Sequence, residues 1–375
     1  MFATLVTMDD RRRIPLRWKL AEEEQTTALF PDERAASRHV GTGQYAGMEF
    51  LHVNARSIVN TVPPASRMPF RYTINAYRGC SHACVYCFAR PTHEYLGLDI
   101  GQDFERRIVV KVNAVERLRA ELRAPRWAGE PIAMGTNTDP YQKAEGKYHL
   151  TRGIIEVLGQ AANPFSLLTK STLVLRDLDV LAAAAQRTDV RANLSIGTMD
   201  RAVWKLTEPG TPPPDKRIEA VRRLNAAGIP TGVLVAPVLP GLSDSEDQLR
   251  AVVEACVDAG AVSVTAIGLH LRPGVRDHWM GWLAGTRPDL VPLYRARFAN
   301  RSYQPDDDQA RLTNLVRTLV AEAQGRYAER TDSRRFMGHR SGHPGPTDAR
   351  RPNPSQHPSR ASRAPVEQLP LLGAS

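Results

Sequence analysis

Three of the four cysteines lie together in the segment Cys80-Ser81-His82-Ala83-Cys84-Val85-Tyr86-Cys87, which has the spacing C-x3-C-x2-C. Three thiolates on one loop can bind three corners of a metal cluster. Gly79 directly precedes the segment and is expected to adopt a positive φ, which allows a tight turn. A [4Fe–4S] cluster is usually held by four thiolates. Three thiolates would leave one iron of such a cluster free to bind a small molecule, and this arrangement is typical of a catalytic cluster.

Two other interpretations of these cysteines remain open. A zinc site could be completed by His82 or His93, or the cysteines could have no metal role. Structural zinc sites take four ligands, and a second C-x-x-C pair is absent from the sequence. Cys256 lies in a helical apolar pattern and is expected to be a buried, inert thiol. Clustered cysteines differ from the spread disulfide framework of small secreted domains and indicate a reducing cytosol.

The elements that position these residues are alternating strand-like and helix-like segments, which begin near residue 71. The strands are short and apolar, as in parallel sheets covered by helices. Repeated βα units of this kind imply right-handed crossovers and one parallel sheet in an α/β fold. The predicted strands are 72–76, 131–135, 165–169, 191–197, 230–237 and 262–269, and the predicted helices are 113–122, 153–161, 175–186, 215–227 and 245–259.

Changes in composition divide the chain into four parts. Residues 1–70 are expected to be an N-terminal extension that packs on the core with short helices at most. Residues 71–275 form the core, and residues 276–330 form a helical C-terminal cap. Residues 331–375 are rich in Pro and Arg, with seven Arg against three acidic residues, and are predicted to be a disordered basic tail.

The overall charge suggests a polyanionic partner. The 375 residues carry a formal net charge of +10, of which the tail holds +4, so the charge is a weak guide to the site. No run approaches the ~20 apolar residues of a membrane span. At the N-terminus an apolar run precedes the charges, which argues against a signal peptide, and a cytoplasmic location is expected.

The cysteine segment resembles the C-x3-C-x-aromatic-C motif of the radical S-adenosylmethionine (radical SAM) superfamily. The resemblance covers about residues 71–275 and implies a partial (β/α)6 TIM-like barrel. It implies that Cys80, Cys84 and Cys87 hold a [4Fe–4S] cluster whose open iron binds S-adenosylmethionine. With a one-electron reductant, such an enzyme cleaves this cofactor to a 5′-deoxyadenosyl radical. From its place in the motif, Tyr86 would lie along the adenine.

The same resemblance suggests further cofactor contacts at the ends of the predicted strands, where parallel βα folds bind ligands. The family's Gly-Gly-Glu-like motif is replaced here by residues 134–142, which contain no Glu. Thr138 or Asp139 could accept a hydrogen bond from the methionyl ammonium. Lys170 could meet the methionyl carboxylate. Ser195 could bond the ribose or, equally, the backbone.

Within the superfamily, the texture is closest to the spore photoproduct lyase-like, or DNA-repair-photolyase-like, branch. The segments 72–80, 138–142 and 169–171 carry this likeness. It favours DNA or another nucleotide-containing substrate, with a lyase-like or transferase reaction. The true lyase uses a cysteine as hydrogen-atom donor. Here only Cys256 is left over, in a predicted helix, which argues against the same reaction unless a tyrosine takes that role; whether a tyrosine or Cys256 would donate the hydrogen atom stays open.

Candidate substrate-binding groups follow the sixth strand. His270 and Arg272 are predicted to point into the barrel mouth or to form a surface turn. Arg90, Arg106 and Arg107 could meet phosphates or be merely solvated.

Two short peptides resemble the motif that docks bacterial proteins on the DNA sliding clamp. One comprises Gln368, Leu369, Pro370, Leu371 and Leu372 in the tail, and the other is residues 25–30. Docking through a disordered tail is one interpretation, and incidental leucines are the other. For the whole protein, the alternatives to a nucleic-acid enzyme are a radical SAM enzyme that modifies a protein or peptide, and a non-catalytic Fe–S protein that binds nucleic acid.

Overall fold

A parallel sheet forms the centre of the computed structural model, which describes residues 33–63, 66, 68–299 and 301–338. The strands lie in the order β11-β10-β9-β8-β7-β4-β3. All neighbours from β4 to β11 pair in parallel, and only the edge strand β3 is antiparallel. The strands are β3 (Val59–Thr61), β4 (Tyr72–Ile74), β7 (Ile132–Met134), β8 (Phe165–Thr169), β9 (Val190–Ser195), β10 (Thr231–Val238) and β11 (Val264–Gly268).

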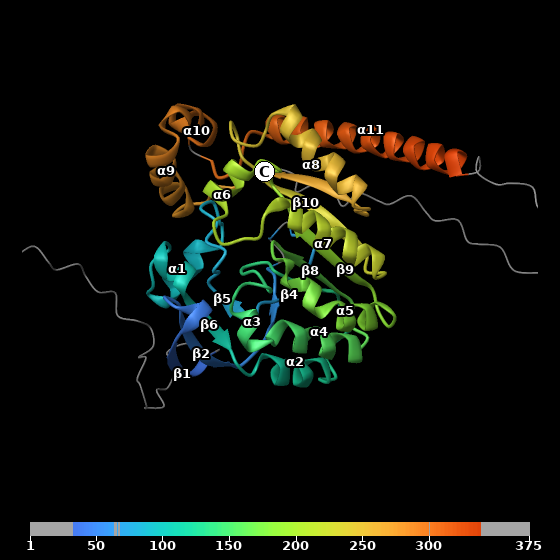
Figure 1. Cartoon of the computed structure of the whole chain (residues 1–375). Coiled ribbons are helices and arrows are strands. Elements are labelled where there is room, and N and C mark those ends of the chain that lie inside the picture. Colours follow the sequence, from blue (N-terminus) through green and yellow to red (C-terminus); the bar gives the residue numbers. More distant parts are fainter. Residues whose placement is uncertain (1–32, 64–65, 67, 300, 339–375) are drawn as a thin grey trace, which may run out of the picture.

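Helices connect these strands and cover the outer face of the sheet in chain order (Figure 1). They are α2 (Ala114–Leu122), α4 (Leu150–Gln160), α5 (Leu178–Ala185), α7 (Pro214–Ala226) and α8 (Glu246–Asp258), with the short helices α3 (Glu145–Tyr148) and α6 (Arg201–Thr207) in two connections. Two of these helices start at a side-chain cap: Asp200 accepts from two N–H groups at the start of α6, and Ser245 forms a capping box with Gln248 at the start of α8. The six parallel strands and their helices confirm the predicted partial (β/α)6 architecture.

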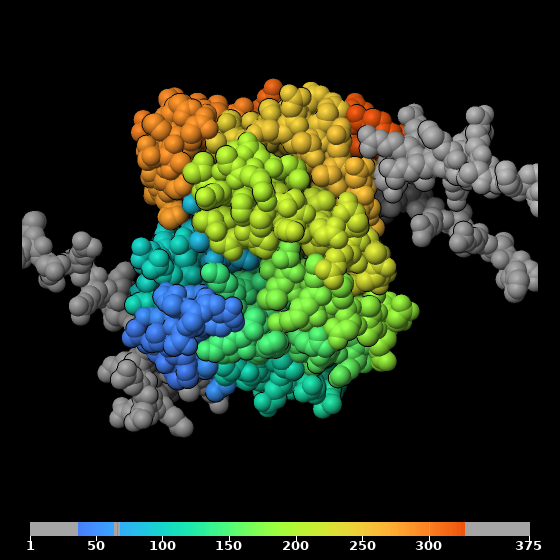
Figure 2. Space-filling view, viewed as in Figure 1, coloured from blue at the N-terminus to red at the C-terminus, as the bar shows by residue number. Residues whose placement is uncertain are grey.

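The segment before the core is the main error in the predicted elements. Residues 33–55 form the strands β1 (Glu33–Val40) and β2 (Glu49–Ala55), not short helices. They belong to a second sheet of order β1-β2-β6-β5, completed by β6 (Arg107–Lys111) and β5 (Tyr77–Arg78). Because β2 pairs with β6, more than fifty residues later, the strand character depends on a distant partner. This small sheet lies at one corner of the molecule, beside α1 (Gln102–Arg106) (Figures 1 and 2).

After the last strand the chain is helical, with α9 (Val275–Thr286), α10 (Val291–Phe298) and α11 (Asp306–Gly338). Helix α11 lies against α8, at the opposite side of the molecule from the β1–β2 corner (Figure 1). It continues past residue 330, where the sequence predicts the tail to begin. Residues 339–375 and residues 1–32, which include both clamp-like peptides, lie outside the described residues. No helix among the described residues is long and apolar enough to cross a membrane.

The described residues form two main apolar clusters, and the second of them contains part of the cysteine segment. The larger one fills the space between the parallel sheet and its covering helices. A second contains Cys84 and Tyr86 together with Leu269 and Leu271, from the loop after β11, and Trp279 of α9. The cysteine loop after the first parallel strand and the loop after the sixth are therefore packed against each other at the carboxyl end of the sheet.

Candidate active site

The cysteine loop follows β4 and the two-residue strand β5, and it is built around a tight turn. Gly79 adopts φ +79°, as its position before Cys80 predicts. A Cβ atom there would lie 2.8 Å from both the His93 ring and the Phe104 carbonyl oxygen, so the position also lacks space for a side chain. Ala83, between the first two cysteines, takes a positive φ of 54° as well. This backbone brings the three cysteine residues onto one compact loop.

Contacts from two other segments hold the loop. The Cys80 N–H donates to the Phe104 carbonyl at 2.8 Å. The Gly79 carbonyl accepts from the Thr138 hydroxyl at 2.6 Å and from the Gln142 amide at 2.9 Å, and the Gln142 side-chain oxygen accepts from the Ser81 N–H at 3.0 Å. The polar run after β7 thus supports the backbone of the cysteine loop.

The thiols of Cys80, Cys84 and Cys87 are free and lie in a largely buried setting. Burial raises the pKa of all three, to about 12 for Cys84, and the Cys84 and Cys87 charges raise the pKa of Cys80 further. The thiols are therefore near one another and protonated in the absence of metal. Lys170 opposes the rise at Cys84 and Cys87, so a cation already stands beside the position where thiolates would form.

The donor set fits an iron–sulfur cluster with three protein ligands, because three thiols come from one loop beside a cation. Among the described residues, no three His, Cys, Asp or Glu side chains already converge on a metal position. The cluster ligands therefore stay a prediction. Each alternative zinc ligand has one ring nitrogen engaged: His82 Nδ1 pairs with Asp139 at 3.3 Å, and His93 Nε2 donates to the Arg107 carbonyl at 3.0 Å, while His93 Nδ1 has no hydrogen-bond partner among the described residues.

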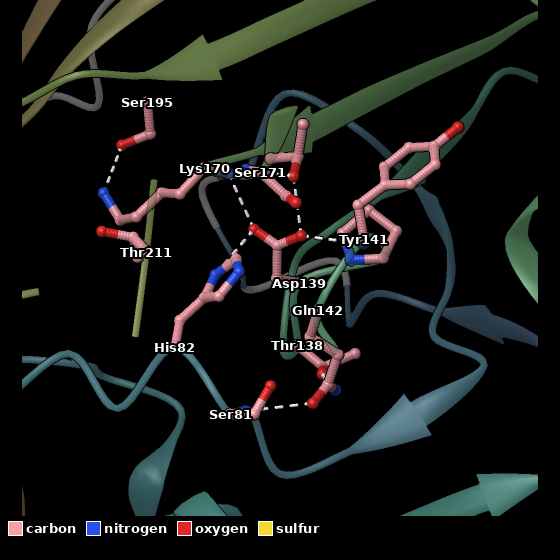
Figure 3. Close-up of polar contacts among 12 residues, drawn as sticks. Ser81, His82, Thr138, Asp139, Tyr141, Gln142, Lys170, Ser171, Ser195 and Thr211 are labelled. Carbon is pink, nitrogen blue, oxygen red and sulfur yellow. Dashed lines mark hydrogen bonds and ion pairs between the residues drawn. The ribbon is translucent and has the colours of Figure 1, made fainter. Parts of the chain in front are cut away.

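Asp139 joins the loop to the neighbouring strand ends (Figure 3). One carboxylate oxygen accepts from the Thr169 hydroxyl at 2.7 Å and the Tyr141 N–H at 2.8 Å. The other accepts from the Lys170 N–H at 2.8 Å and pairs with His82. Burial raises the pKa of Asp139, but His82 and these hydrogen bonds outweigh it and lower the pKa. Asp139 thus links the cysteine loop to the end of β8, and both of its carboxylate oxygens accept hydrogen bonds or ion pairs.

The structure brings the other predicted cofactor residues together. Lys170 Nζ donates to the Ser195 hydroxyl at 2.6 Å (Figure 3). It also donates to the Ala236 carbonyl at 3.1 Å. It also lies 5.6 Å from the centre of the Tyr86 ring. Ser195 donates to the Ala236 carbonyl at 2.7 Å, so the backbone contact that the sequence left open is present. Tyr86, Lys170 and Ser195 therefore share one buried corner.

Sequence reasoning missed two charged residues in this corner, Glu208 after α6 and Arg217 on α7. The Tyr86 hydroxyl donates to Glu208, and Lys170 Nζ lies 3.0 Å from the same carboxylate oxygen. Arg217 pairs with the other oxygen. The only local signal is an acidic residue at the start of the turn Glu208-Pro209-Gly210-Thr211, and nothing in the sequence connects it with Tyr86.

The predicted substrate groups lie in the loop after β11. The His270 ring stacks on Tyr303, with ring centres 4.0 Å apart and planes 4° apart. Burial and the nearby Arg272 lower the pKa of His270. Tyr303 is 51% exposed, so the far side of the stacked pair meets solvent. The sequence did not identify Tyr303, whose contact with His270 spans two loops.

Two of the arginines considered for phosphate binding have other partners. Arg90 is fully buried and holds the Cys84 carbonyl with two hydrogen bonds, so the phosphate assignment is wrong for this residue. Arg107 pairs with Glu49 and Asp103, and Arg106 is exposed. Cys256 is fully buried in α8, as its apolar pattern predicts, and burial raises its pKa.

Comparison with known proteins identifies the family. Residues 74–253 match the family model described as Radical SAM superfamily. A protein of Mycobacterium tuberculosis (strain H37Rv), named as uncharacterised, is 46% identical over 285 residues, covering 76% of this chain and 84% of the relative. A second relative, also named as uncharacterised, comes from Methanocaldococcus jannaschii and is 30% identical over 199 residues, covering 53% and 71% of the two chains. The chain belongs to the radical SAM superfamily and is a radical SAM enzyme.

Solved structures agree on the fold. Spore photoproduct lyase complexed with dinucleoside spore photoproduct matches with a TM-score of 0.56 and 20% identity, covering 73% of this chain and 79% of the lyase. A mutant of that lyase with bound AdoMet and the dinucleoside matches with a TM-score of 0.53 and 20% identity, covering 72% and 78%. The fold is thus the one that the sequence resemblance to the spore photoproduct lyase-like branch implies.

Proposed function

We propose that this protein cleaves S-adenosylmethionine reductively at a [4Fe–4S] cluster held by Cys80, Cys84 and Cys87, and that the resulting radical acts on a nucleic acid or nucleotide. The observation that carries the proposal is the position of the C-x3-C-x-aromatic-C loop at the carboxyl end of a (β/α)6 sheet, beside the partly exposed cation of Lys170. When bound, the cluster supplies one electron from an external reductant, and S-adenosylmethionine supplies the 5′-deoxyadenosyl radical.

The residues of the buried corner would hold and orient the cofactor. Lys170, whose three donors go to Ser195, Ala236 and Glu208, would exchange one of these contacts for the methionyl carboxylate. Ser195 would bind the ribose, and Tyr86 would lie along the adenine. For the methionyl ammonium, the contacts favour Thr138 over Asp139. Four contacts already use the four acceptor positions of the Asp139 carboxylate, whereas the Thr138 oxygen accepts from Gln142 alone among the described residues and keeps one position.

A nucleic-acid substrate is supported by the His270–Tyr303 pair. Exposed aromatic rings stack with nucleobases whatever their sequence, and the neighbouring Arg272 supplies a positive charge for phosphate. Spore photoproduct lyase is a neighbour whose solved complexes contain a dinucleoside. Cys256 is fully buried in a helix, which argues against it as hydrogen-atom donor and favours a tyrosine.

Anaerobic reconstitution with iron and sulfide, followed by dithionite and S-adenosylmethionine, tests the chemistry. We expect 5′-deoxyadenosine from the wild-type protein and none from Cys80→Ala, Cys84→Ala or Cys87→Ala. Cys256→Ala is the matched control and should keep both the iron and the product. An intact cluster without any product would contradict the proposal and favour a non-catalytic Fe–S protein that binds nucleic acid.

Binding of single-stranded DNA tests the substrate class separately. Affinity should fall steeply with salt, because neutralised phosphates release counterions. Tyr303→Leu should lower the affinity about 5–160-fold, since stacking contributes about 1–3 kcal/mol per base and 1.4 kcal/mol is tenfold, whereas Tyr303→Phe should retain it. Transfer of deuterium between labelled cofactor and candidate polymers would then identify the substrate. Label found only in a protein or peptide would favour the alternative substrate class.

A further inference from the structure

The proposed cofactor site contains a largely buried group of three charged side chains, Lys170, Glu208 and Arg217, of which the proposed function uses only Lys170. Glu208 contacts the Tyr86 hydroxyl and Lys170, and Arg217 and the Thr211 hydroxyl contact Glu208. The side chains of Glu208 and Arg217 are only 6% and 1% exposed, whereas that of Lys170 is 14% exposed. Lys170 is thus the member of the group with the best access from outside.

All three guanidinium nitrogens of Arg217 donate hydrogen bonds to neighbouring protein groups. Its Nε donates to the Pro212 carbonyl at 2.8 Å, and one terminal nitrogen donates to the Ser195 carbonyl at 2.9 Å. The other terminal nitrogen donates to the Thr211 hydroxyl at 2.6 Å and to Glu208. The rigid guanidinium fork therefore fixes one oxygen of the Glu208 carboxylate.

The second Glu208 oxygen faces the cofactor site, where it meets both the Tyr86 hydroxyl and Lys170 Nζ. Burial raises the pKa of Glu208, but Arg217, Lys170 and Tyr86 outweigh it and lower the pKa to about 2, so the carboxylate is charged at neutral pH. Two cations and one anion leave this buried group with one net positive charge, which matches a single incoming carboxylate.

The backbone around Glu208 is locked to the cysteine loop. The Val85 N–H donates to the Thr207 carbonyl at 3.1 Å, and the Gly210 N–H donates to the His82 carbonyl at 3.0 Å. A Cβ atom at Gly210 would lie 2.3 Å from the Ser81 carbonyl oxygen, so the two loops are in direct contact there. Glu208 therefore keeps a fixed position relative to the cysteines.

We propose that Glu208, held by Arg217, is a positioning residue for S-adenosylmethionine: it sets the orientation of the Tyr86 ring and of the Lys170 ammonium that receive the cofactor. The inference rests on the proposed function. Without the Glu208 charge, the Tyr86 hydroxyl and Lys170 Nζ lose their shared anchor, and Arg217 is left as a buried cation without its counter-ion.

The test measures binding of radiolabelled S-adenosylmethionine to reconstituted protein by equilibrium dialysis, together with iron content and the change that the cofactor causes in the electron paramagnetic resonance spectrum of the reduced cluster. For Glu208→Gln we expect affinity about 10–100-fold weaker, as for the loss of a hydrogen bond to a charged group. The iron content should be unchanged, and the spectral change should be reduced at wild-type saturating concentrations.

Glu145→Gln is a closely matched control. Glu145 is also a buried carboxylate that accepts from a tyrosine and an arginine, Tyr77 at 2.6 Å and Arg176 at 2.7 Å, but it lies on α3 and contacts neither Tyr86 nor Lys170 in the described interactions. Its replacement should cost comparable stability and leave cofactor affinity unchanged. An equal loss of affinity in both variants would overturn the positioning role, because general destabilisation would then explain it.

Tyr86→Phe decides the question where Glu208→Gln does not fold. It keeps the ring and removes only the hydroxyl bound to Glu208. An affinity for S-adenosylmethionine that is at least about fivefold weaker than that of the wild type would support the inference. Wild-type affinity in this variant, or in a folded Glu208→Gln, would overturn it while the proposed function stands. If the wild-type protein itself binds no S-adenosylmethionine, the proposed function fails and the inference fails with it.

Discussion

Replacing Arg90 by Met should lower the free energy of unfolding far more than replacing an arginine on the nearby surface does. Arg90 makes five hydrogen bonds, to the carbonyls of Cys84, Ile100 and Gly101 and to the Glu105 carboxylate, at 2.6–3.3 Å. Methionine retains the apolar stem but none of these bonds. The Cys84 carbonyl would lose both bonds from Arg90 and keep only the one from the Cys87 N–H at 3.2 Å. Lost hydrogen bonds to a charged group cost about 1.5–3 kcal/mol. With the lost Glu105 pair, we expect the free energy of unfolding to fall by about 3–5 kcal/mol.

The assay is urea unfolding of the cluster-free, reduced protein, followed by far-ultraviolet circular dichroism. Arg90→Lys keeps the charge without the planar fork and should lose an intermediate amount. Arg106→Gln, at an exposed position on α1, should stay within about 0.5 kcal/mol of wild type. A loss below 1 kcal/mol for Arg90→Met would refute the view that this buried guanidinium supports the loop.

Three further outcomes are expected. Gly79→Ala should lower the free energy of unfolding by more than 1 kcal/mol and by more than Gly129→Ala does, because both positions have φ above +70° but only Gly79 lacks space for a Cβ; equal losses in urea titrations would contradict this. The Glu208 pKa is about 2 in the folded protein against an ordinary value of 4.5, so the folded state binds fewer protons than the unfolded state. The free energy of unfolding should therefore fall by about 2 kcal/mol between pH 5 and pH 3. Urea titrations at several pH values should show that Glu208→Gln lacks this loss, and an unchanged pH dependence in the variant would contradict the prediction. Cys256→Ala should cost about 1 kcal/mol in urea titrations without changing iron content, and iron loss would give this cysteine a metal role.

The strands and helices of the core follow from local patterns. Short apolar runs separated by helical periodicity predicted six parallel strands, and each corresponds to a strand from β4 to β11 with bounds shifted by at most a few residues. The predicted strand 165–169 coincides with β8. Such patterns suffice because parallel strands buried on both faces are apolar throughout, and their helices must cover them. The β1–β2 hairpin lacked this signal, because its pairing with β6 is long-range.

The cysteine spacing and the turn at Gly79 are properties of one short segment, so the amino-acid sequence by itself determined them, and with them the family. Tertiary structure decided what surrounds that segment. Tyr86 and Glu208 are 122 positions apart in the chain, and Arg90 turns inward to carbonyls when its sequence equally allowed a phosphate contact. Asp139, proposed as a cofactor ligand, is engaged by the end of β8 and by His82. Charged side chains find their partners only when distant segments are brought together, because the partner that compensates burial is not encoded near them.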